Sequence, residues 1–130
     1  MAVYLDSSAF VKLLVPEPES RALRSFLGRQ RTRHVSSAIL RAEALRAVRH
    51  AGPEVLATTR TALRRVDLVA VTDGILDAAG MIEPRVLRTL DAIHLATALA
   101  LGDDLDVVVT YDARMAEGAR WLGLGAASPG

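Results

Sequence analysis

The stretch Val107-Val108-Val109-Thr110-Tyr111-Asp112 predicts the fold more clearly than any other part of this 130-residue sequence. Its β-favouring residues form a continuous apolar run rather than an alternating one, which is typical of a strand buried on both faces of a parallel sheet. The run leads directly into an aspartate. A second run of the same kind, Val3-Tyr4-Leu5, leads into Asp6. Both runs therefore predict central strands that are followed by an acidic side chain.

Strand patterns alternate with helical patterns along the rest of the chain. Two further short strands are expected at 34–36 and 67–71. Helices are expected at 7–15, 19–28, 53–65, 87–101 and 113–122. Two more are expected to begin at caps: one runs from Ser36 or Ser37 to about 50, and the other from Thr72 or Asp73 to about 82. Pro84 interrupts the chain after the second of these. The alternation predicts an α/β domain with a parallel sheet, followed by a glycine-rich tail.

Length and composition narrow the class of protein. One domain, residues 1–130, suits the length, and a hydrophobic content of 51% is enough to build a core. The absence of cysteine excludes disulfides and cysteine-based metal sites and nucleophiles. The start does not resemble a signal peptide and no apolar run is long enough to cross a membrane, so a soluble cytoplasmic protein is expected. A net charge of +1 provides no global field that would attract nucleic acid.

Asp6 and Asp112 are the first two candidate functional residues. In open parallel sheets, ligands bind beyond the carboxyl ends of the strands, so these two carboxylates share one crevice if their strands are neighbours. Each aspartate also precedes a predicted helix. Taken alone, each is better explained as the N-cap of that helix.

Glu43 is the third candidate, because it lies on the apolar stripe of its predicted helix with Leu40, Ala44, Ala47 and Val48. Burying a lone carboxylate costs several kcal/mol, so such a group usually has a partner. An arginine nearby in the sequence or a metal ion would serve, and the helix alone leaves both open.

Asp91 is the fourth candidate, in a helix that is apolar nearly all round and therefore central. Arg88, Asp91, His94 and Thr97 form one polar ridge along it, which faces either water or a polar cleft. His94 is expected to be packed or hydrogen-bonded rather than to bind zinc, because no other histidine is nearby in the sequence.

Four carboxylates gathered in one crevice need a compensating cation. Ligand sets made only of oxygen suit Mg²⁺ or Mn²⁺ rather than Zn²⁺. Such an ion lowers the pKa of a bound water, polarises a phosphoryl oxygen and stabilises the leaving oxygen. This combination of tasks points to phosphodiester hydrolysis.

Residues 4–13, 37–43, 90–98 and 109–115, which contain these acids, resemble the four acidic motifs of PIN-domain ribonucleases of the VapC toxin type. Order, spacing and chain length all fit, so the resemblance covers the whole chain. It implies a PIN-like three-layer α/β/α domain with a parallel five-stranded sheet, and endoribonuclease cleavage of single-stranded or loop RNA with Mg²⁺ or Mn²⁺.

The resemblance also implies roles for individual residues. Asp6 and Asp91 would be direct metal ligands, and Asp112 would bind metal directly or through water. Glu43 would orient or activate the attacking water. Two hydroxyl side chains, Ser8 and Thr110, match positions close to the site and would support the metal ligands.

The family further implies partners. Its members pair as homodimers and are held inactive by a small VapB-type antitoxin, which inserts a segment near the active site and supplies most of the contacts to operator DNA. The helices within 16–28 and 37–65 are candidate surfaces for the antitoxin or the dimer, although most of their apolar residues are expected to be core. Lys12 is expected to steer substrate or to pair with one of the acids. The arginine clusters at 29–33 and 60–65 are weaker candidates for RNA phosphates.

Other classes of protein remain as alternatives. A PIN-fold nuclease outside toxin systems would share the four motifs, and a non-catalytic PIN-fold module would act only through a partner. An aspartyl phosphotransferase is disfavoured, because Ser8 stands where the dehalogenase-type pattern has a second aspartate and Lys12 is misplaced for a receiver domain.

Overall fold

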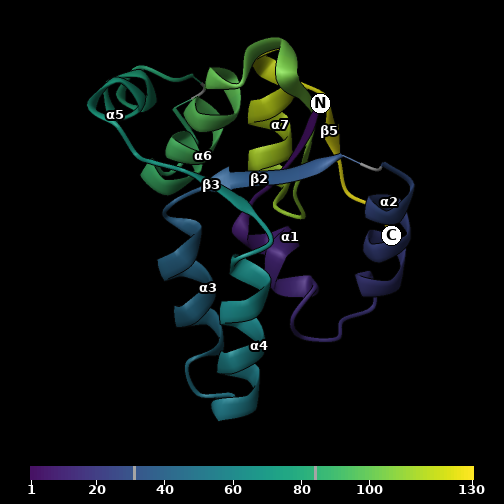
Figure 1. Cartoon of the computed structure of the whole chain (residues 1–130). Coiled ribbons are helices and arrows are strands. Elements are labelled where there is room, and N and C mark those ends of the chain that lie inside the picture. The colour runs from purple at the N-terminus through teal and green to yellow at the C-terminus, as the bar shows by residue number, and fades with distance from the viewer. Residues whose placement is uncertain (31, 84) are drawn as a thin grey trace.

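The computed structural model describes residues 1–30, 32–83 and 85–130, which form a twisted sheet with helices on both sides (Figure 1). Its strands are β1 Ala2–Leu5, β2 Arg33–Ser37, β3 Asp67–Val69, β4 Leu105–Val109 and β5 Ala126–Ala127. Its helices are α1 Ser7–Lys12, α2 Ser20–Gln30, α3 Leu40–Val48, α4 Pro53–Leu63, α5 Asp73–Gly80, α6 Thr89–Ala100 and α7 Ala113–Trp121, with a short 3₁₀ turn, η1, at Gly102–Asp104.

The strands form one sheet in the order β3-β2-β1-β4-β5, and every neighbouring pair is parallel. Parallel neighbours need crossover connections, which the helices provide. β1 and β4, the two strands followed by aspartates, lie side by side in the centre, with Leu5 opposite Val109. The structure thus confirms the predicted α/β class, and it shows that the strands before Asp6 and Asp112 are neighbours, which is the condition for a shared crevice.

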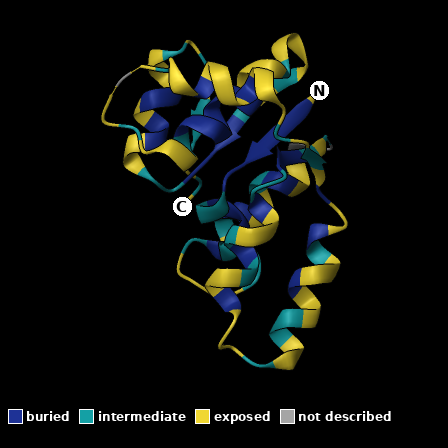
Figure 2. Cartoon of the chain, turned by 90° about the vertical axis from the view of Figure 1, so that its left-hand side faces the viewer, coloured by how far each residue is buried: buried dark blue, intermediate teal, exposed yellow. Residues whose placement is uncertain are grey.

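Alternate side chains of β1 pack on opposite faces of the sheet. Val3 and Leu5 contact the core beneath α1 and α2, whereas Ala2 and Tyr4 contact the core beneath α6 and α7. All four residues are fully buried. Figure 2 shows this arrangement as buried strands between helices that are exposed on their outer sides. A strand covered on both faces has no solvent side, which explains why its sequence is continuously apolar.

The strands differ from the predicted ones in their bounds and in the tail. β3 ends at Val69 instead of residue 71, and β2 extends one residue beyond each end of the predicted 34–36. β4 spans Leu105–Val109, so the prediction that it runs to Tyr111 was wrong; Thr110 still donates its backbone N–H to Ala127, while its side chain hydrogen-bonds with Asp6. β5, in the glycine-rich tail, was not found from residue patterns, although the family resemblance implied a fifth strand. It is only two alanines long and carries no propensity signal, and it is held by pairing with β4.

The predicted helix caps are largely confirmed. The carboxylates of Asp6 and Asp112 and the hydroxyl of Thr72 accept hydrogen bonds from the first turns of α1, α7 and α5. Neither Ser36 nor Ser37 is the N-cap of α3, which was the expectation. Ile39 holds that position, because the hydroxyl of Ser36 donates to a strand carbonyl instead.

Several helix boundaries also differ from the predicted ones. α1 ends three residues early, and α3, α4 and α5 each end about two residues early. α2 continues two residues past the predicted end at Gly28, and α6 begins two residues late. The expected interruption at Pro84 lies outside the described residues. α3 and α4 form a hairpin that extends away from the sheet (Figure 1). Within the described ranges, no helix is long and apolar enough to cross a membrane.

Candidate active site

Asp6 and Asp112 lie at the same edge of the sheet, because the strands that precede them are neighbours. Asp6 directly follows β1, and its backbone N–H donates to the carbonyl oxygen of Val109 at the end of β4 at 3.3 Å. Asp112 begins α7 three residues further on. The carboxyl ends of the two central strands therefore bring together the first and fourth acidic motifs, which are about a hundred residues apart in the chain.

The Asp6 side chain is the most buried of the four acids, at 3% exposure. Its Oδ1 accepts hydrogen bonds from Ser8 Oγ at 2.7 Å and from the Ala9 backbone N–H at 3.0 Å, and its Oδ2 accepts one from Thr110 Oγ1. Burial raises the pKa of this carboxyl, and the three hydrogen bonds oppose that rise in part. The geometry fixes both oxygens of Asp6.

Thr110 and Ser8 connect the two strand ends. Besides donating to Asp6, Thr110 Oγ1 accepts from the Asp112 backbone N–H at 3.1 Å, and Ser8 Oγ accepts from the Tyr111 backbone N–H at 2.9 Å. Each hydroxyl thus binds one group from the β1 side and one from the β4 side. This agrees with their expected position beside the acids.

Asp91 approaches Asp112 from the first turn of α6. Partial burial raises the pKa of Asp91, and the nearby negative charge of Asp112 raises it further. The Asp112 carboxylate itself caps α7, with Oδ1 accepting from the backbone N–H groups of Arg114 and Met115 at 2.8 and 3.2 Å. The functional and the capping interpretations of Asp112 are therefore compatible.

Glu43 has a partner that the sequence analysis did not consider. Its Oε1 lies 2.7 Å from Nε2 of His94, while Oε2 accepts a longer hydrogen bond from Ser7 Oγ at 3.4 Å. Among the described residues Glu43 forms no ion pair with an arginine, so that alternative was wrong. The polar ridge of α6 does not face water in its central part, since His94 and Thr97 are buried. His94 is hydrogen-bonded, as predicted.

The oxygen chemistry of the site suits a hard cation. Asp6, Asp91 and Asp112 take part in none of the ion pairs within residues 1–30, 32–83 and 85–130. Burial raises the pKa values of Asp6 and Asp91, and the charge of Asp112 raises that of Asp91 further, so a positive charge would stabilise these carboxylates. Hydroxyl and carboxylate oxygens suit Mg²⁺ or Mn²⁺. No three acidic or histidine side chains of the described part of the chain converge as a preformed cation cage. The donor set fits such an ion by its chemistry.

Lys12 does not pair with any of the four acids, so that expectation was wrong. Its Nζ lies 2.5 Å from Oε2 of Glu17 and 2.9 Å from Oε2 of Glu19, and 4.7 Å from the centre of the Tyr111 ring. The two glutamates raise the pKa of the lysine through these hydrogen bonds. The ammonium is held beside the site rather than in it.

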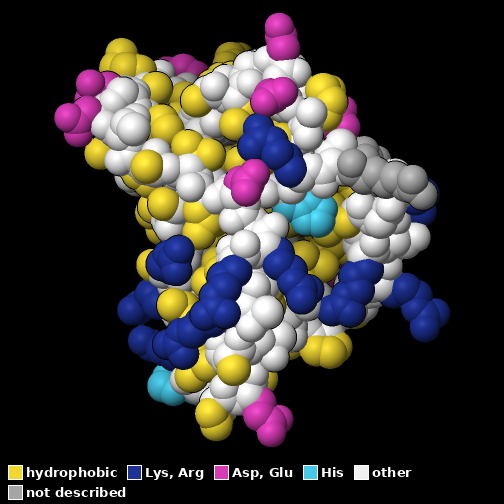
Figure 3. All heavy atoms as spheres, viewed as in Figure 1, with side chains coloured by type: hydrophobic (Ala, Val, Ile, Leu, Met, Phe, Trp, Pro, Cys, Tyr) yellow, Lys and Arg dark blue, Asp and Glu magenta, His cyan; other side chains and the backbone are white. Residues whose placement is uncertain are grey.

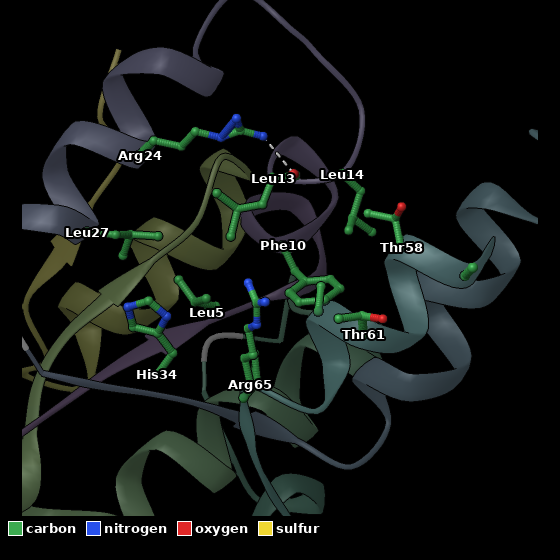
Figure 4. Close-up of a pocket in the computed structure, with 13 residues that line it drawn as sticks. Leu5, Phe10, Leu13, Leu14, Arg24, Leu27, His34, Thr58, Thr61 and Arg65 are labelled. Carbon is green, nitrogen blue, oxygen red and sulfur yellow. Dashed lines mark hydrogen bonds between the residues drawn. The ribbon is translucent and has the colours of Figure 1, made fainter. Parts of the chain in front are cut away.

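Two hollows lie near these residues. The first, the acid-side groove, has a volume of about 810 Å³ and is lined by side chains that include Ser8, Glu43, Arg46 and Tyr111. The second, the helix groove, has a volume of about 640 Å³ and lies between α1, α2 and α4. Figure 4 shows its apolar floor, which includes Phe10, with Arg24 and Arg65 beside it. The two hollows share no lining residue.

Basic side chains gather on the face that carries α3 and α4 (Figure 3). Of the predicted clusters, Arg60, Arg64 and Arg65 are exposed. In the other cluster, Arg33 is held by Asp67 and Asp104 at 3.1 and 3.0 Å, and Arg31 lies outside the described residues. Arg33 is therefore already paired within the chain.

Comparison with known proteins identifies the class. The family model described as PIN domain matches residues 3–120. The chain therefore belongs to the PIN-domain family, in agreement with the parallel sheet and the acidic edge.

Individual relatives place it more narrowly. The chain is 53% identical over 130 residues to ribonuclease VapC46 of Mycobacterium tuberculosis, with 98% of each chain covered. It also resembles a toxin–antitoxin complex from Klebsiella pneumoniae and the sarcin–ricin loop-cleaving toxin VapC20 of M. tuberculosis, both with a TM-score of 0.77. The two structures are 19% and 15% identical to this chain in sequence. Each alignment covers 98% of this chain, together with 98% and 99% of the respective structures, so the similarity confirms the fold. Within the PIN-domain family, the chain is a VapC-type ribonuclease by its sequence relationship.

Proposed function

We propose that the protein is a Mg²⁺- or Mn²⁺-dependent endoribonuclease whose reaction takes place at Asp6, Glu43, Asp91 and Asp112. The observation that carries this proposal is the gathering of Asp6, Asp91 and Asp112 at one edge of the sheet, where burial raises the pKa values of Asp6 and Asp91, the charge of Asp112 raises that of Asp91 further, and none of the three forms an ion pair within the described residues. Catalytic sites commonly perturb titratable groups in this way.

Each residue has a task in this proposal. Asp6, Asp91 and Asp112 hold the metal, which when bound supplies the charge that stabilises the developing phosphoryl and leaving oxygens. Ser8 and Thr110 fix both oxygens of Asp6, so that the ligand is oriented before substrate arrives. Glu43 borders the acid-side groove and orients the attacking water through a carboxylate oxygen.

The biological role follows from the family. We infer that the chain forms one PIN domain over residues 1–130 and acts in the cytoplasm as the toxin of a VapBC-type module, as a homodimer. A VapB-type antitoxin inhibits it and carries the contacts to operator DNA. The Klebsiella pneumoniae neighbour is a toxin–antitoxin complex, which supports such a partner.

The helix groove is the surface that suits the antitoxin best. Its floor is apolar, and Arg24 and Arg65 lie beside that floor (Figure 4). An apolar helix that carries acidic residues along one side would match both features. The groove opens between α2 and α4, within the segments that the sequence suggested for this partner.

The proposal is tested by incubating purified protein with total cellular RNA in Mn²⁺ or Mg²⁺, and with EDTA, and mapping new 5′ ends. Asp6→Asn and Asp91→Asn are run in parallel. We expect discrete ends that need both the metal and both aspartates. If antitoxin-free wild type produces no ends beyond those of the two variants, the catalytic proposal fails and a PIN-fold binding module takes its place.

A further inference from the structure

A buried hydrogen-bonded chain connects the centre of the sheet with Glu43. The hydroxyl of Tyr4, on β1, lies 2.7 Å from Nδ1 of His94, on α6, and Nε2 of the same ring lies 2.7 Å from Oε1 of Glu43, on α3. Tyr4 and His94 are 0% and 1% exposed. Three elements that are distant in the sequence thus meet through one imidazole ring.

The hydrogen positions in this chain follow from its chemistry. Burial raises the pKa of Tyr4, so its phenol keeps its single hydrogen. The neighbouring hydroxyls of Ser36 and Thr97 donate to backbone carbonyls, so they do not supply hydrogens to the phenol oxygen. An ionised Glu43 only accepts hydrogen bonds, so Nε2 of His94 must carry a hydrogen to make a contact of 2.7 Å. Nδ1 then accepts from Tyr4 when the ring is neutral.

The contact with His94 determines how the Glu43 carboxylate is oriented. Oε1 is occupied by the ring N–H, while Oε2 has only the long contact with Ser7 Oγ. Glu43 borders the acid-side groove, whereas His94 does not. The free oxygen is therefore the one left for a water in the groove. Without the contact with His94, rotation about the three side-chain bonds of Glu43 could move the carboxylate away from such a water.

We propose that His94 is a positioning residue, which holds Oε1 of Glu43 through an N–H anchored by Tyr4 and leaves Oε2 aimed at the attacking water. This inference rests on the proposed nuclease function. It assigns a role to a histidine to which the proposed mechanism gives no contact with metal or substrate. Loss of a group that orients a reacting residue commonly costs about 10- to 100-fold in activity.

Two substitutions separate positioning from packing. In His94→Gln, the side-chain amide can place an N–H near the position of Nε2, so the donor to Glu43 is kept. In His94→Asn, the amide reaches only the Nδ1 position, so the contact with Tyr4 is kept and the donor to Glu43 is lost. Thr59→Val, which removes a buried hydroxyl in α4 that bonds only within its own helix, is the matched control for lost stability.

The activity measurement uses single-turnover cleavage of one RNA identified by the end mapping. We expect His94→Asn to lower the maximal rate constant about 10- to 100-fold. The enzyme concentration and the metal concentration that give half-maximal rate should be unchanged. His94→Gln should recover most of that loss, and Thr59→Val should lower only the melting temperature. In a Glu43→Gln background, His94→Asn should have almost no further effect, because both changes act on the same carboxylate. The proposal fails if His94→Asn lowers the rate constant equally in the wild-type and Glu43→Gln backgrounds. It also fails if His94→Asn and His94→Gln lower the rate constant equally.

A second measurement does not depend on activity. Long-range ¹H–¹⁵N spectra of the histidine rings report which nitrogen carries hydrogen, and the chain has three histidines, so His94→Asn identifies the signal. We expect a hydrogen on Nε2 of His94 and a shift of that signal in Glu43→Gln. A ring protonated only on Nδ1 contradicts the positioning role even in an active enzyme. If the spectrum is as expected but the protein cuts no RNA, the hydrogen-bonded chain is supported and only the nuclease function is disproved.

Discussion

Asp6 shows how a buried carboxylate is stabilised by hydrogen bonds, since it takes part in no ion pair among the described residues. Ser8, Thr110 and the Ala9 backbone together donate to both of its oxygens. Hydrogen bonds to a charged acceptor are stronger than neutral ones, so they offset part of the cost of burial. The pKa of Asp6 is nevertheless raised, which shows that the compensation is incomplete. The remaining electrostatic cost is what a bound cation would remove.

At the same scale, Asp91→Asn should stabilise the metal-free protein at neutral pH. The folded state holds a proton on Asp91 more tightly than the unfolded chain does, because burial and Asp112 raise its pKa. The stability that this group contributes is fully present below an ordinary aspartate pKa and is lost as pH rises through the raised pKa. Asparagine does not ionise and avoids that loss, which we expect to be about 1 kcal/mol or less at this partly exposed position.

This prediction is checked by thermal unfolding in EDTA at a series of pH values. The variant should melt higher than wild type at pH 7, and the difference should shrink as the pH falls below the raised pKa of Asp91. A variant that is less stable than wild type at pH 7 would show that burial and the charge of Asp112 do not destabilise the ionised form of Asp91. The result also establishes whether the Asp91→Asn variant used in the RNA assay is folded.

At the scale of elements, the close approach of α6 and α7 holds Asp112 near Asp91. Gly118 lies in the middle of α7, and a Cβ placed there would come within 3.0 Å of side-chain atoms of Leu87 and Leu95. The missing side chain lets α7 pack directly against these leucines. Since Asp112 is the N-cap of α7, the seating of this helix also positions the acid.

Gly118→Val should therefore destabilise the protein by about 1–3 kcal/mol through overpacking. Gly28→Ala is the matched control, because Gly28 is also helical and a Cβ there meets nothing within 4 Å. That control should gain about 0.5–1 kcal/mol from helix propensity. Urea unfolding of both variants measures the two effects. A stabilised Gly118→Val variant would mean that the leucines move aside without cost.

At the scale of the whole molecule, the helix groove and the acidic edge are separate surfaces, which predicts that inhibitor binding and catalysis can be altered independently. Thr58 and Thr61 are exposed side chains of α4 that line the helix groove. The double variant Thr58→Glu/Thr61→Glu places negative charge beside the apolar floor. We expect it to weaken binding of the cognate VapB-type antitoxin about ten-fold or more, through repulsion and desolvation.

The antitoxin affinity is measured by calorimetric titration, with RNA cleavage measured on the same preparations. Cleavage by the free double variant should match wild type, because no residue of the helix groove borders the acid-side groove. Ala100→Glu, an exposed change on α6, is the control and should leave the affinity unchanged. Wild-type affinity in the double variant would place the antitoxin on another surface.

The sequence by itself determined the α/β class, the two apolar strands, the acids that follow them and the helix caps of Asp6 and Asp112. It narrowed the cap of α5 to Thr72 or Asp73. These features depend on local patterns, since a strand buried on both faces must be continuously apolar and a cap lies next to its own helix. The relation to PIN-domain ribonucleases likewise came from short motifs and their spacing.

Only the tertiary structure decided the partners of the polar side chains. Glu43 meets His94 across fifty-one residues, and the chain alone gave no signal that α3 and α6 would bring them together. The pairing of Lys12 with Glu17 and Glu19, and the pairing of β5 with β4, were equally invisible in local patterns. The physical reason is that a side chain's type limits which partners it accepts, while the packing of distant elements selects the one it meets.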